Sequence, residues 1–223
     1  MATTDPTSFS YSLTQQQSSI RDTAELVIGF LAILAILWLP THEQLIFGPI
    51  VLLGPLVVVL LKRPTLNQLG FGLRGLARSL WILPAAVALT VISVYAAKDA
   101  GTFHALAHPE FSHVYGYVLW TMYQQFLLQD FFMPRLTHVL ASDAAIAVAA
   151  ILFSVAHLPN LTLAAGTLVW GVVSCLLFRR YHNLYMIGLA QGILGLCFAV
   201  CVPDALIHHM RVGLGYWNYH VGH

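Results

Sequence analysis

Charged side chains are scarce in this chain, and long basic or acidic tracts are missing. Asp, Glu, Lys and Arg make up 9% of its 223 residues, against roughly 25% in ordinary soluble domains. Without a basic tract, the sequence speaks against a nucleic-acid partner. Hydrophobic residues reach 58%, and so few charges cannot cover the surface of a soluble fold. The composition therefore indicates an integral membrane protein.

Cysteine is equally sparse, and the N-terminal segment lacks basic residues. Cys175, Cys197 and Cys201 lie in apolar runs, the last two one helical turn apart, so we expect free, buried thiols. Residues 1–20 are rich in Ser, Thr and Gln and contain no Lys or Arg. They do not resemble a cleavable signal peptide, and we expect a disordered polar tail there.

Apolar runs dominate residues 21–207, each about the length needed to cross a hydrocarbon core of roughly 30 Å. They predict an all-α fold, a polytopic transmembrane helix bundle of about seven spans. The spans are expected near 24–40, 45–61, 79–97, 114–133, 143–158, 162–178 and 184–202. Residues 62–78 combine basic side chains with leucines, which is typical of an amphipathic segment lying in the membrane surface.

Basic residues indicate the orientation, because they concentrate on the cytoplasmic side of membrane proteins. With the N-terminus in the cytoplasm and the C-terminus outside, only Lys98 and Arg211 fall on the outer side. The cytoplasmic side then holds Arg21, Lys62, Arg63, Arg74, Arg78, Arg135, Arg179 and Arg180. Short loops and the lack of a cleavable signal favour a bacterial inner membrane, although a protein of the endoplasmic reticulum would look similar.

Small residues recur four apart in the last two predicted spans. Gly188 and Gly192 share one face of the seventh span, and Gly171 and Cys175 share one face of the sixth. Such faces let helix backbones approach closely within a membrane. We therefore expect both helices in the interior of the bundle.

Polar side chains interrupt three of the predicted spans. Gln124, Gln125 and Gln129 lie in the fourth span, His157 ends the fifth, and Gln191 lies in the seventh. Unpaired amides and imidazoles are costly in hydrocarbon, so these groups should face one another or a wet cavity. Two interpretations remain open, an internal site or hydrogen bonds that merely join helices.

Asp130 is treated separately, because it lies at the cytoplasmic end of the fourth span near Arg135. We expect these two side chains to form an ion pair at the membrane interface.

These positions resemble the motifs of the CPBP (Abi) family of intramembrane proteases, which includes the CAAX proteases. Members carry a Glu pair and an Arg on one helix, Phe-x-x-x-His on the next, and a later His with Asn or Asp four residues on. Gln124 and Gln125 occupy the Glu positions and Gln129 the Arg position, while Phe153 and His157 match intact. Gln191 and Gly195 occupy the last two positions. The resemblance implies a CPBP-like core over about 66–202.

The departures from these motifs bear on the activity. In the family, glutamate and histidine activate water for peptide cleavage within the membrane. An amide oxygen is far too weakly basic to replace that carboxylate, and Gln191 cannot replace an imidazole. The resemblance thus marks His157, Gln124, Gln125 and Gln191 as the catalytic positions, and we expect the fold without the proteolysis.

Histidine is plentiful outside the predicted spans. His104 and His108 have the i,i+4 spacing of helical metal ligands, with His113 close by, but Pro109 and the lack of further ligands make this a weak metal site. Residues 208–223 combine histidines with Tyr and Trp, which predicts an interfacial tail. We expect no cofactor; a haem or chlorophyll ligated by His157 is the alternative.

Three functional classes remain. The first is an inactive CPBP relative that binds membrane lipids, a prenyl group or a partner, or serves as a subunit of a membrane complex. The second is an active endopeptidase with an atypical Gln/His site, acting on a prenylated or transmembrane peptide. The third is a cofactor-carrying membrane subunit.

Overall fold

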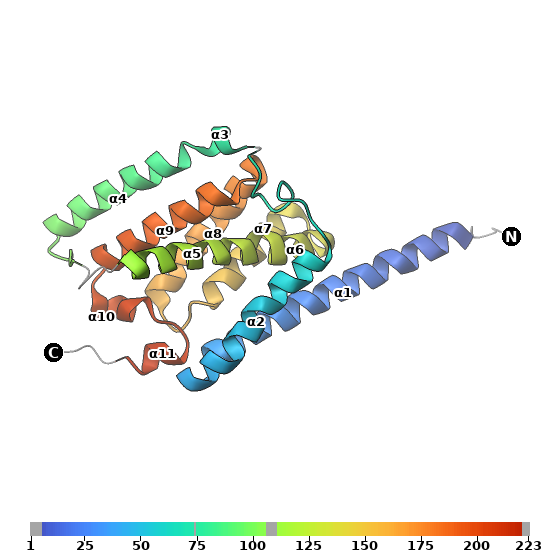
Figure 1. Cartoon of the computed structure of the whole chain (residues 1–223), viewed down its shortest axis with the longest axis horizontal. Helices are drawn as coiled ribbons and strands as arrows, with labels where there is room; N and C mark the ends of the chain where they lie inside the picture. The colour runs from blue at the N-terminus through green and yellow to red at the C-terminus, as the bar shows by residue number, and fades with distance from the viewer. Residues whose placement is uncertain (1–5, 74, 106–110, 220–223) are drawn as a thin grey trace.

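A computed structural model describes residues 6–73, 75–105 and 111–219, with side chains for 16–73, 75–105 and 114–219. The chain is 79% helix, and its described residues contain no strand (Figure 1). The main helices are α1 (Pro6–Leu37), α2 (Thr41–Leu61), α4 (Ile82–Asp99), α5 (Phe111–Phe126), α7 (Ser142–Val155), α8 (Leu161–Tyr181) and α9 (Leu184–Cys201). Short elements are α3 (Leu76–Ser79), α6 (Met133–Val139), α10 (Asp204–Ile207), η2 (His208–Met210) and α11 (Leu214–Trp217).

A helix lies at each of the seven predicted spans, but fewer meet the requirements for crossing a membrane. Among the described residues, four segments are long and apolar enough: Thr41–Leu61, Leu76–Asp99, Leu161–Tyr181 and Leu184–Cys201. Helix α7 has only 14 residues, while α1 and α5 contain polar stretches. Apolar side chains such as Leu45 and Ile50 of α2 are exposed, as expected for a surface that faces lipid. The structure thus supports a helical membrane protein.

Helix α1 begins well before the first predicted span. The sequence predicts a disordered tail over 1–20, whereas residues 6–20 are helical and residues 1–5 lie outside the described part. Pro6 is the first residue of the helix, a position that suits the fixed φ of proline. Neither Gly nor Pro follows until Gly29, so no helix breaker interrupts residues 7–28.

The loop between α2 and α4 is irregular rather than a continuous amphipathic helix. Its leucines divide, because Leu69 is buried in the core while Leu66 and Leu73 are exposed. The carbonyl of Gly70 accepts a hydrogen bond from the Leu184 backbone N–H at 2.9 Å. The loop therefore attaches to the start of α9.

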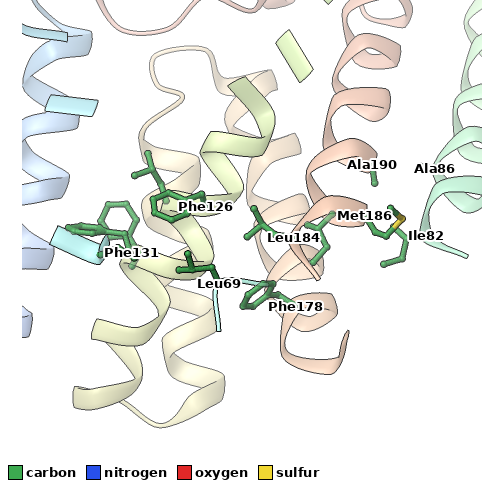
Figure 2. Close-up of a cluster of buried hydrophobic side chains, with 13 residues drawn as sticks. Leu69, Ile82, Ala86, Phe126, Phe131, Phe178, Leu184, Met186 and Ala190 are labelled. Atoms are coloured by element: carbon green, nitrogen blue, oxygen red, sulfur yellow. The ribbon is translucent and has the colours of Figure 1, made fainter. Parts of the chain in front are cut away.

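The core forms where α5, α8 and α9 meet that loop. Figure 2 shows Phe126, Phe178 and Leu184 converging there. A Cβ on Gly188 would lie 3.1 Å from the Met122 Cα of α5, which is tighter than an ordinary contact, so glycine favours this close approach of α5 and α9. On α8, a Cβ on Gly171 would lie 3.0 Å from the Ala150 Cα of α7. The predicted interior position of α8 and α9 is confirmed.

Helix α5 continues into a π-helical turn, η1 (Leu127–Phe132), before α6. Pro134 is at the start of α6, where it lacks an N–H and its ring would clash with the carbonyl four residues earlier. A wider turn relieves that clash. One Oδ of Asp130 is buried in this turn without a hydrogen-bond partner among the described residues.

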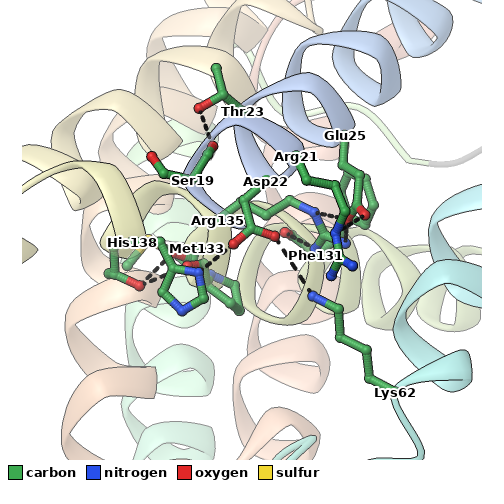
Figure 3. Close-up of polar contacts among 12 residues, drawn as sticks. Ser19, Arg21, Asp22, Thr23, Glu25, Lys62, Phe131, Met133, Arg135 and His138 are labelled. Atoms are coloured by element: carbon green, nitrogen blue, oxygen red, sulfur yellow. Dashed lines mark hydrogen bonds and ion pairs between the residues drawn. The ribbon is translucent and has the colours of Figure 1, made fainter. Parts of the chain in front are cut away.

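Arg135 pairs with Glu25 of α1, so the expected ion pair with Asp130 is wrong. Its Nη2 lies 2.6 Å from the Glu25 carboxylate, and its Nη1 donates to the Phe131 carbonyl at 2.6 Å (Figure 3). The helical start of α1 brings Glu25 to this position, which the sequence did not indicate.

A second acid of α1 completes this ion cluster. Asp22 contacts His138 Nδ1 of α6 at 2.5 Å and Lys62 Nζ, which directly follows α2, at 3.8 Å (Figure 3). Burial opposes ionisation of Asp22, but the His138 hydrogen bond and the Lys62 charge outweigh it, so the pKa is lowered. The cluster fixes the α1–α2 hairpin to α6.

Candidate functional site

Four glutamine side chains form one hydrogen-bonded network between α5 and α9. Gln191 is at its centre: its Oε1 accepts from Gln125 Nε2 at 2.6 Å and from the Trp170 indole at 3.0 Å. Its Nε2 donates to Gln124 Oε1 at 2.5 Å. Gln129 Nε2 donates to Gln125 Oε1 at 3.1 Å. The amides of the fourth and seventh predicted spans therefore meet and bond to one another.

His157 lies just after the end of α7, with its ring against Phe153. Its Nδ1 is 2.6 Å from the Phe153 carbonyl. A carbonyl only accepts, so Nδ1 carries the proton and Nε2 is left with its lone pair. No hydrogen bond joins that Nε2 to another described residue.

Gln124, Gln191 and His157 line one cavity of about 890 Å³. Its walls come from α1, α2, α4, α5, η1, α7, α8 and α9, and they are largely aliphatic and aromatic. The aromatic part includes Trp120 and Trp170. An apolar cavity with a few convergent polar groups is the usual form of a small-molecule site.

The catalytic positions that the family resemblance marks thus divide into two groups. Gln124, Gln191 and His157 face the cavity, whereas Gln125 is fully buried behind it and holds Gln191 in place. Gln129 likewise lies outside the cavity, with its Nε2 also 3.6 Å from Cys175 Sγ.

Several lining residues carried no signal in the sequence. The indole of Trp170 reaches Gln191 from α8, and Tyr117 comes from α5. A Cβ on Gly195 would lie 2.0 Å from the Tyr117 hydroxyl. The position that resembles the family's Asn or Asp is therefore filled by Tyr117. Tyr117 and Gly195 are far apart in the sequence, so residue spacing could not have predicted their contact.

The chemistry open to this cavity is limited. Among the described residues that line it there is no Asp or Glu, and His157 is the one histidine. The amides are neutral hydrogen-bonding groups and do not take up a proton near neutral pH. The arrangement can bind and orient a polar group at the end of an apolar chain.

The three cysteines are free, as predicted. Cys175 and Cys197 are buried, while Cys201 is half-buried. Cys197 and Cys201 lie with their sulfur atoms 3.8 Å apart, and both line the cavity.

The weak metal site is not assembled in the described part of the chain. His104 lies in an irregular stretch, with its Nδ1 3.3 Å from the Thr102 carbonyl. His108 and the side chain of His113 lie outside the described residues. Among those that are described, no three His, Cys, Asp or Glu groups could hold a metal ion.

Comparison of the chain with protein-family models, with curated proteins and with solved structures finds no match in any of the three.

Proposed function

We propose that this protein is a non-catalytic membrane protein of CPBP-like architecture that binds a chain lipid, acyl or prenyl, in the cavity. The observation that carries the proposal is that Gln124, Gln191 and His157 all line one largely apolar cavity. The chain would lie against the aliphatic and aromatic walls. Its polar end would bond to the free Nε2 of His157 and to the amide of Gln124.

The lining of the cavity favours a lipid chain over a peptide. Most of the lining side chains are aliphatic or aromatic. An extended peptide brings carbonyl and N–H groups that must be paired in such surroundings, whereas a hydrocarbon chain needs no such partners.

The lining residues support the proposed absence of proteolysis. Water activation needs a base, a partner and an oxyanion stabiliser. His157 is the one basic group among the described lining residues, and its Nδ1 is bound to its own helix. In this proposal the amides of Gln124 and Gln191 bind the polar end of the ligand.

We also propose seven spans in a bacterial inner membrane, with a cytoplasmic N-terminus. The ion cluster brings the basic residues Lys62 and Arg135 to one end of the bundle. Lys98 ends α4 at the other end, where α9 also ends (Figure 1). This separation is what the positive-inside rule requires.

The test is whether purified protein retains a lipid that depends on the cavity. We expect mass spectrometry of the extracted sample to find one chain lipid per protein. Thr167→Phe should abolish its retention by filling the cavity, because Thr167 lines it and bonds only to its own helix. Thr137→Phe is the matched control, since Thr137 bonds in the same way on α6 but is exposed. Equal retention by both variants would contradict the proposal.

One observation favours the endopeptidase as a second candidate. The free Nε2 of His157 could accept a proton at the cavity wall. Cleavage of a prenylated peptide by the purified protein, abolished in His157→Ala, would establish it. A visible absorbance band from the same sample would instead identify a cofactor-carrying subunit.

A further inference from the structure

The segment after α9, residues 203–213, crosses the end of the cavity, and we call it the strap. Met210 and Val212 of the strap line the cavity together with Leu37 and Thr41 at the α1–α2 turn. Figure 1 shows α10 and α11 between the end of α9 and that turn. The sequence predicts an interfacial tail from residue 208, and in the structure residues 208–219 include η2 and α11.

The backbone of the strap is strained. His208, His209 and Met210 follow one another with φ of 46°, 50° and 58°. This left-handed region is unfavourable for residues that have a Cβ, and three in succession are rare. The Nδ1 of His208 is also buried without a hydrogen-bond partner among the described residues. Such a conformation persists only where its surroundings hold it.

Asn160 provides the main hold. Its Nδ2 donates to the Ile207 carbonyl at 2.7 Å and to the Arg211 carbonyl at 3.2 Å, on either side of the strained residues. Its Oδ1 caps α8 by accepting from the Leu163 N–H at 3.0 Å. The Gly213 N–H donates to the Leu158 carbonyl at 2.9 Å. The α7–α8 loop therefore holds the strap at three points.

A second contact fixes the strap to the chain beyond it. Asp204 Oδ2 accepts from the Tyr219 hydroxyl at 2.7 Å, and its Oδ1 accepts from the His209 N–H at 2.7 Å. The Asp204 side chain keeps 23% of its surface exposed. This outer contact can break without exposing the core.

We propose that the strap is a lid that closes this end of the cavity and opens to admit the ligand. A strained backbone held by a few hydrogen bonds has a closed state that is only modestly favoured, as a lid requires. The role of the lid rests on the proposed function, but its opening is measurable without any ligand.

Cys201 is the reporter, because it lines the cavity beside Val202 and the strap. Purified protein in mild detergent would be treated with a charged maleimide, and labelling would be followed for each cysteine by peptide mass spectrometry. In the wild type we expect Cys201 to label at least tenfold more slowly than in SDS. In Asn160→Ser we expect its rate to rise roughly tenfold, since serine keeps the cap but loses both strap bonds.

The matched control is Asn183→Ser. Asn183 is an equally buried cap on α9, with its Oδ1 accepting from the Met186 N–H at 3.2 Å, at the opposite end of the bundle. It should leave Cys201 labelling unchanged. Cys175 is the internal control, because it is buried against Gln129 away from the cavity.

A second variant covers the case in which Asn160→Ser fails to fold. Tyr219→Phe removes only the hydroxyl bond to Asp204 and should raise Cys201 labelling several-fold. The lid is refuted if wild-type Cys201 labels as fast as in SDS, if neither variant accelerates it, or if Cys175 accelerates equally. If the purified wild type retains no lipid but the variants still accelerate Cys201 labelling as expected, the proposed function is refuted and the lid stands.

Discussion

An amide both donates and accepts hydrogen bonds, so glutamine side chains can pair with one another in an interior that offers no water. The network is directional as a result. Gln191 donates to Gln124 but accepts from Gln125. Two adjacent glutamines of α5 therefore have opposite roles toward the same partner, although both occupy positions that resemble the family's glutamate pair.

This asymmetry predicts different outcomes for two identical substitutions. Gln124→Glu keeps an oxygen that accepts from Gln191, at a position that faces the cavity, so we expect a smaller loss, of about 1–2 kcal/mol, from the partly buried carboxyl group. Gln125→Glu places a carboxylate against the Gln191 oxygen at a fully buried site. We expect that variant to lose about 2–3 kcal/mol or more. Unfolding by SDS titration in mixed micelles would measure both, and equal losses would contradict the assigned directions.

At the scale of elements, the helix positions followed from the sequence because apolar length and Gly, Pro and Asn breaks are local signals. The early start of α1 did not, since a polar run such as residues 6–20 has no apolar periodicity to mark it. The sequence did not predict the partner of Arg135 either, because Glu25 reaches it only through the tertiary packing of α1. The cavity was foreseeable, because polar groups in lipid must meet, while Tyr117 and Trp170 were not.

The attachment of α1 to α6 should weaken in acid. Asp22 precedes the first predicted span, and its pKa in the fold is lowered because the His138 hydrogen bond and Lys62 outweigh burial. A lowered pKa means that its stabilisation is complete above the unfolded value of about 3.9 and is lost as pH falls through the folded value.

We therefore expect the SDS unfolding midpoint of the wild type to decrease as the pH drops from about 4 through the lowered pKa of Asp22, and to decrease less in Asp22→Asn. Asp143→Asn is the control, because Asp143 is 90% exposed in its pair with Arg179 and such surface pairs contribute little. A wild type and an Asp22→Asn variant with parallel pH profiles would show that Asp22 is not held as described.

At the scale of the whole molecule, the two ends of the bundle differ in how they are closed. One end is fixed by the ion cluster of α1, α2 and α6, and the other by hydrogen bonds of the strap. Ion pairs suit a surface among lipid headgroups. In the strap, most hydrogen bonds are accepted by backbone carbonyls, which can accept from water instead when the strap opens. Leu37, Thr41 and Met210 line the cavity at the strap end.

The number of spans decides which faces these two ends meet. Seven spans place the termini on opposite sides of the membrane, whereas the four segments that qualify by length and composition would place them on the same side.

In a variant whose three cysteines are replaced by serine, Gln17→Cys and Trp217→Cys would report the two termini. Trp217 is 63% exposed, so its replacement should not disturb packing. In intact spheroplasts an impermeant maleimide should label position 217 and spare position 17 until the cells are lysed. Labelling of both positions before lysis would refute the seven-span topology. Labelling of position 17 alone would show that the orientation in the membrane is the reverse of the one proposed.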